Sequence, residues 1–130
     1  MATVNLNNDT YEVNSGLDEI VIVKSLGDIP GGRALDVSAM PATMKVIKAG
    51  HVIIVSNTGV YKPMPLNGGG TAYGSLPANH SYVGVLKASV SVKDARAAIM
   101  TMGQVNAAAS PYEVGSGIKS GLPNIQFLYV

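Results

Sequence analysis

Tyr82-Val83-Gly84-Val85-Leu86-Lys87-Ala88-Ser89-Val90-Ser91-Val92 is the longest regular stretch in this chain of 130 residues. Alternate positions from Tyr82 onward are apolar or small, whereas Lys87 and the two serines lie between them. A period of two residues is typical of a strand with one face in the core and the other in water. The stretch therefore predicts one half-buried strand, whose core face would be formed by Tyr82, Leu86, Ala88, Val90 and Val92.

Shorter apolar segments separated by turn residues surround this strand, from Thr43 to the C-terminus. The further strands expected are residues 44–47, 51–56, 60–62 and 95–102. Asn57-Thr58-Gly59 predicts a tight hairpin, because glycine readily takes the positive φ that such a turn requires. Residues 105–109 predict one helical turn before Pro111. Short, closely spaced strands of this kind indicate an all-β fold of the small sandwich or barrel type.

Residues 1–42 have a different character, since they are rich in asparagine at the start and contain one apolar run at residues 20–23. Asp18 and Glu19 would suit the first turn of a helix, but the β-branched run favours a strand over residues 17–26. We therefore expect an N-terminal arm of residues 1–42 with one possible strand, and a β-rich domain of residues 43–130. The apolar end of the chain, residues 121–130, is expected to pack into a core or onto a neighbour.

The first 16 residues contain few large apolar side chains, in two alternating pairs: Val4, Leu6, Tyr11 and Val13. These residues bury too little surface to offset the entropy lost on ordering. Fully extended, the segment would span on the order of 50 Å. The alternation suits a strand that adds to the edge of another sheet, where backbone hydrogen bonds supply affinity.

Charge and cysteine content exclude several classes of function. Charged residues make up 13% of the chain, the net charge is +1, and the basic residues are scattered singly. No basic stripe is present to neutralise phosphates, so we expect no nucleic-acid partner. The chain has no cysteine, which excludes disulfides, thiolate metal sites and cysteine nucleophiles.

The residues that could support catalysis or bind a cofactor do not form known motifs. His51 and His80 are isolated from each other and from the few carboxylates, so neither a metal site nor a catalytic triad is expected. The glycine-rich loop at residues 67–70 lacks the lysine of a phosphate-binding loop, and we expect it to need a partner to become ordered. Met100-Thr101-Met102 is similar to the Met-Lys-Met hairpin of biotin and lipoyl carriers, but it lacks the essential lysine. We therefore expect a protein that is not an enzyme and has no cofactor.

Neither a secretion signal nor a membrane span is expected. The N-terminus has no basic segment followed by an apolar one, and the longest apolar runs, such as residues 52–55, are too short to cross a bilayer. A chain without disulfides fits assembly in a reducing cytoplasm.

Four segments, taken together, resemble the head decoration proteins of lambda-like tailed phages. A glycine-anchored strand at residues 47–55 is followed by a hairpin strand at residues 59–63. After a variable loop come the strand at residues 82–90 and the small-residue segment at residues 97–106, which leads into alanines. The resemblance covers about half of the chain, from Lys48 to Ala109.

The resemblance implies a small β-tulip or barrel-like domain with an extended N-terminal arm. It implies a structural virion protein that binds the exterior of the capsid and stabilises the expanded lattice, with synthesis in the host cytoplasm. The partners it implies are the major capsid protein and two further copies of this chain in a homotrimer. Val4, Leu6, Tyr11 and Val13 would be the capsid-binding residues of the arm. Another virion β module, such as a head fibre base or a tail-associated adaptor, is the alternative.

Overall fold

The computed structural model describes residues 18–129, in which strands predominate and the helices are short. The longer strands are β1 (Ile22–Asp28), β4 (Val52–Ser56), β5 (Tyr61–Pro63), β6 (His80–Leu86), β9 (Ile99–Asn106) and β10 (Ile125–Leu128). Two-residue strands are β2 (Arg33–Ala34), β3 (Val46–Ile47), β7 (Val90–Ser91) and β8 (Arg96–Ala97). The helices are α1 (Asp18–Val21), the 3-10 turn η1 (Ala107–Ala109) and α2 (Ser116–Gly121). The expectation of an all-β fold is confirmed.

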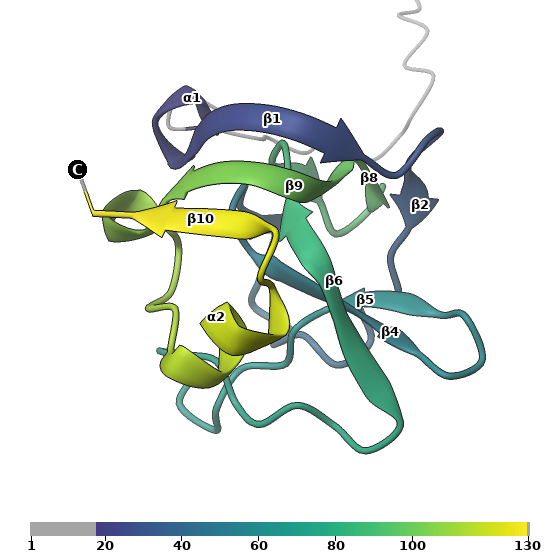
Figure 1. Cartoon of the computed structure of the whole chain (residues 1–130). Helices are drawn as coiled ribbons and strands as arrows, with labels where there is room; N and C mark the ends of the chain where they lie inside the picture. The colour runs from purple at the N-terminus through teal and green to yellow at the C-terminus, as the bar shows by residue number, and fades with distance from the viewer. Residues whose placement is uncertain (1–17, 130) are drawn as a thin grey trace, which may run out of the picture.

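The long strands form one sheet in the order β1-β9-β6-β4-β5, and β10 also pairs with β9. All of these pairings are antiparallel except that of β10 with β9, which is parallel. In Figure 1, β1, β9 and β10 lie side by side, and β6 runs away from β9 at a steep angle toward the hairpin of β4 and β5. Two small two-stranded sheets, β2 with β8 and β3 with β7, complete the domain.

The core lies on both faces of β4 and β6. Val52 and Ile54 belong to one apolar cluster, whereas Ile53 between them belongs to a second cluster. Val85 and Leu86 are divided between the same two clusters. A strand that is buried on both faces requires a continuous apolar run, and full burial of each such side chain contributes about 1.5–3 kcal/mol. This is why residues 52–54 are apolar without alternation.

The prediction that residues 82–92 form one strand with a single core-facing side is wrong. Ile53 pairs with Gly84 and Ile54 with Tyr82, so Val83 is an extra residue that interrupts the register. Such a bulge exchanges the two faces of a strand. Tyr82 therefore packs against the cluster that contains Val85, and Val83 against the other cluster.

The expected strand also ends early. β6 ends at Leu86, and the chain turns before β7, which pairs with β3. Leu86 is buried and Lys87 reaches outward to Asp28, as the pattern predicts. Ala88, however, is exposed and Ser91 is buried, because the turn rotates the chain between the two strands.

The expected boundary between an arm of residues 1–42 and a domain of residues 43–130 is also wrong. The two alternatives for residues 17–26 both occur, since α1 leads directly into β1. β1 pairs with β9 from Ile22 to Asp28, and β2 pairs with β8. Val21 is buried in the first apolar cluster. Residues from 18 onward are therefore part of the domain, because their backbone groups are satisfied by strands that lie far along the chain.

Several local expectations are confirmed. β4 and β5 form the hairpin, and Gly59 has a φ of +89°. The helical turn forms as η1, and the C-terminal residues pack as β10 beside β9. The loop at residues 67–70 is not as expected, because the Asn67 side chain accepts a hydrogen bond from the Thr71 N–H at 3.0 Å and the Gly70 N–H bonds to the Asn67 carbonyl. Internal hydrogen bonds thus close this loop without a partner.

Gly84 sits where β6 crosses β9. A Cβ atom at this position would overlap the Met100 carbonyl oxygen and lie 3.3 Å from the Cα of Thr101. The two strands pair only at Val85 with Met100 and Leu86 with Ile99, directly beside this contact. The absence of a side chain at Gly84 therefore permits the two halves of the main sheet to join.

We predict that Gly84→Ala destabilises the protein by about 3 kcal/mol, because backbone atoms of β9 cannot move aside without breaking the ladder. Gly117→Ala is the matched control, since a Cβ at Gly117 in α2 meets nothing within 4 Å. That control should change stability by no more than about 1 kcal/mol, in the stabilising direction. Urea unfolding of both variants measures the difference, and equal midpoints would contradict the role given to Gly84.

Candidate interaction surface

Residues 18–129 contain no group of three or more histidines, cysteines or carboxylates placed to hold a metal ion. Two of the carboxylates form ion pairs. Asp94 accepts a hydrogen bond from the Arg96 Nε at 2.8 Å, and Asp28 lies 2.7 Å from the Lys87 ammonium. These two hydrogen bonds hold the pKa of each carboxyl below its usual value. The arrangement is that of structural ion pairs at the surface.

His51 lies in the core, with 1% of its surface exposed. Its Nε2 donates a hydrogen bond to the Met64 carbonyl oxygen at 3.0 Å. The rings of Tyr73 and Tyr112 stand edge-on to the imidazole, at 5.2 and 5.6 Å between centroids. Burial lowers the pKa of His51 to about 4, so the imidazole is neutral at pH 7. This histidine joins three chain segments and is inaccessible to a substrate.

Asp18 has a role that sequence reasoning missed, because its partner is 71 residues away along the chain. Its carboxylate accepts hydrogen bonds from the Ser89 N–H at 2.8 Å and the Ser89 hydroxyl at 2.7 Å. The Ser89 hydroxyl oxygen also accepts a hydrogen bond from the Ala49 N–H at 3.0 Å. These bonds hold the start of α1 against the chain segments that contain Ser89 and Ala49.

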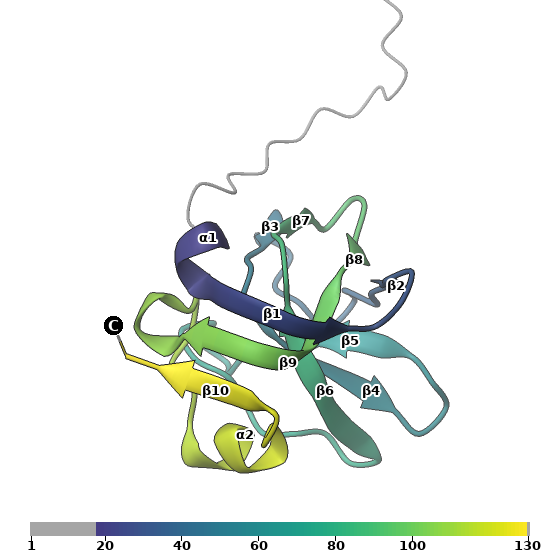
Figure 2. The same ribbon diagram turned by 45° about the horizontal axis from the view of Figure 1, so that its top comes forward.

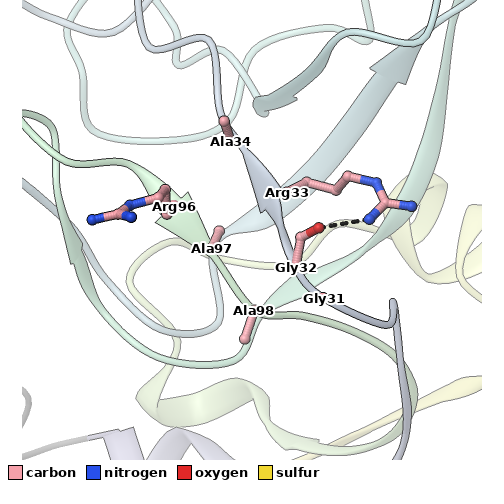
Figure 3. A pocket seen from close by; sticks show the side chains of 7 residues that line it. All are labelled: Gly31, Gly32, Arg33, Ala34, Arg96, Ala97 and Ala98. Atoms are coloured by element: carbon pink, nitrogen blue, oxygen red, sulfur yellow. Dashed lines mark hydrogen bonds between the residues drawn. The ribbon is translucent and has the colours of Figure 1, made fainter.

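Arg33 and Arg96 line a shallow hollow between β2 and β8, but their guanidinium groups do not come together there (Figure 3). The side chains of Arg33 and Arg96 point in opposite directions. Arg33 donates to the Gly32 carbonyl at 2.6 Å, and Arg96 binds Asp94. Because the two guanidinium groups face away from each other, they do not form a site for a single anion.

Large apolar side chains are exposed mainly along β1. Four of the six exposed large hydrophobic residues among residues 18–129 lie on α1, on β1 or beside β1, and we call them the β1 surface: Ile20, Val23, Leu26 and Met102. They are between 43% and 59% exposed. The register places Met102 of β9 opposite Gly27, next to Leu26. The other two, Val60 and Tyr129, lie in the β4–β5 hairpin and after β10.

β1 is also the terminal strand of the main sheet in the part of the chain that the structure describes. Figure 2 shows α1 and β1 along one side of the sheet, with β9 between β1 and β10. Exposed apolar residues on an edge strand favour association with another molecule. The β1 surface is therefore the candidate site of interaction. Its location could not be derived from the sequence, where residues 20–26 resemble any other apolar strand.

The arm residues identified from the sequence, Val4, Leu6, Tyr11 and Val13, lie outside the described residues. Within residues 18–129, no helix has the length and apolar character needed to cross a membrane.

We predict that His51 makes the fold sensitive to acid. The unfolded chain binds a proton at His51 near pH 6.5, whereas the folded protein does so only near pH 4. The stabilisation is therefore complete above about pH 6.5 and is lost as the pH falls toward 4, by about 3 kcal/mol in total. His51→Gln keeps a neutral donor for the Met64 carbonyl and should remove this dependence, whereas His80→Gln should retain it. Urea unfolding from pH 7 to pH 4 tests this, and equal slopes for His51→Gln and wild type would contradict it.

No protein-family model, no curated protein and no solved structure matches this chain.

Proposed function

We propose that this chain is a non-enzymatic structural protein that binds the outer surface of a tailed-phage capsid and stabilises the expanded lattice as a homotrimer. In this proposal it is made in the host cytoplasm and resides on the exterior of the virion. The observation that carries the proposal is the β1 surface, which offers apolar side chains on an edge strand. This strand follows closely after residues 1–17, the segment that we call the N-terminal arm.

The resemblance to head decoration proteins adds support, because its four segments occupy adjacent strands. Residues 47–55 cover β4 except its last residue, and residues 82–90 cover β6 from its third residue onward. Residues 59–63 include β5, and residues 97–106 include β9. These strands are neighbours in the order β9-β6-β4-β5. Segments that resemble one family in sequence order thus also form one contiguous part of the sheet.

The charge distribution fits a protein whose surface is partly covered in its working state. Only 13% of the residues are charged, about half of the usual proportion. All nine basic residues lie at position 24 or later, whereas Asp9 and Glu12 are the only charged side chains before Asp18. The side chains of residues 1–17 therefore carry a net negative charge, whereas those of the following domain carry a net positive charge. The two parts can contact differently charged regions of a partner surface.

In this proposal Val4, Leu6, Tyr11 and Val13 supply the side chains of a strand that the arm adds to the major capsid protein. Main-chain hydrogen bonds provide affinity in such an addition, and alternate side chains set the register. A head fibre base or a tail-associated adaptor would use the same fold on another partner. The particle with which the protein co-purifies distinguishes these roles.

We predict that deletion of residues 2–16 leaves the domain folded but weakens binding to expanded capsids at least tenfold, about 1.4 kcal/mol. Among residues 18–129, the sheet and both apolar clusters are built from residues 21 and beyond, so we expect an unchanged urea midpoint. Co-sedimentation with expanded heads that lack this protein measures binding. Wild-type affinity of the truncated protein would show that the arm is not the capsid-binding element. Failure of the full-length protein to bind would contradict the proposed function itself.

A further inference from the structure

We infer that the β1 surface is a second, side-chain contact with the same partner that holds the N-terminal arm. This inference rests on the proposed function, in which that partner is the major capsid protein. It goes further by assigning Ile20, Val23, Leu26 and Met102 to the interface.

The position of Asp18 restricts where the partner can lie. Its two hydrogen bonds to Ser89 hold the start of α1 against the loop between β6 and β7. Val13 is five residues before Asp18, and five extended residues span on the order of 17 Å. A partner that binds Val13 must therefore lie within about 17 Å of the start of α1. Ile20, two residues after Asp18, is 51% exposed and begins the β1 surface.

The size of the β1 surface indicates that it acts together with the arm. Each side of a stable protein interface contributes roughly 800 Å², and four half-exposed side chains fall well short of this. The arm supplies the remaining contacts in this arrangement. The two elements are continuous along the chain, so binding of one raises the effective concentration of the other at the partner.

The residues of the β1 surface predict the kind of surface that the partner should present. Between residues 20 and 26 the only charged side chain is Lys24, which is exposed. The complementary surface should therefore be apolar, with a carboxylate opposite Lys24. The ladder between β1 and β9 has irregular register at three places, and such bulges oppose the addition of a further strand. Contact through side chains therefore suits β1, whereas strand addition suits the arm.

Two exposed residues of nearly equal accessibility provide a matched test. Met102 of the β1 surface is 43% exposed, and Val60 of the β4–β5 hairpin is 42% exposed. Met102→Glu should weaken binding of the full-length protein to expanded heads at least tenfold. Val60→Glu should leave binding within about twofold of wild type. Leu26→Glu, at the most exposed position of the surface, should repeat the effect of Met102→Glu. Urea midpoints confirm that all three variants are folded.

The possible results separate the inference from the proposed function. Wild-type binding by both Met102→Glu and Leu26→Glu, with strong binding of the unmodified protein, would overturn the inference and leave the proposed function standing. If the unmodified protein does not bind, the proposed function fails and the inference with it. If analytical ultracentrifugation shows that Met102→Glu changes the oligomeric state and Val60→Glu does not, the β1 surface is a contact between copies, which overturns the inference.

Discussion

Gly84 passes directly over the Met100 carbonyl, and this close contact determines how the two halves of the main sheet meet. Only two residue pairs join β6 to β9, yet they connect the β4–β5–β6 part of the sheet to the β1–β9–β10 part. Any side chain at Gly84 would force the strands apart at that crossing. The crossing also separates the two apolar clusters, because Met100 packs in one and Ile99 in the other.

The exposure of β1 follows from this arrangement. Residues 52–54 of β4 and residues 84–86 of β6 are buried, so this part of the sheet provides little surface for a partner. β9 pairs with β1 along one edge and divides its other edge between β6 and β10. β1 is left at the end of the sheet, with Ile22 turned toward the core and Val23 and Leu26 exposed. The strand that closes the sheet is thus also the one that can contact another molecule.

The candidate site was only partly predictable from the sequence. The alternation of Val4, Leu6, Tyr11 and Val13 marks a segment that needs an external sheet, since an alternating strand requires something to cover its apolar face. The β1 surface carries no comparable signal, because exposure depends on what lies opposite each residue. Asp18 is similar. A carboxylate before an apolar run suggests a helix start, but its partner Ser89 lies in the loop between β6 and β7, 71 residues along the chain.

Local sequence patterns predicted the all-β class, the β4–β5 hairpin and a helical turn within residues 105–109, of which residues 107–109 form η1. These depend on local properties: β-branched runs, a glycine at positive φ and a proline that ends a helical turn. The burial of individual residues between 82 and 92 could not be predicted in this way, because the bulge at Val83 arises from pairing with β4 and reverses the faces. The place of β1 in the sheet also depends on pairing with a distant strand. The edge of β9 that satisfies the backbone of β1 lies more than 70 residues along the chain, beyond the reach of any local pattern.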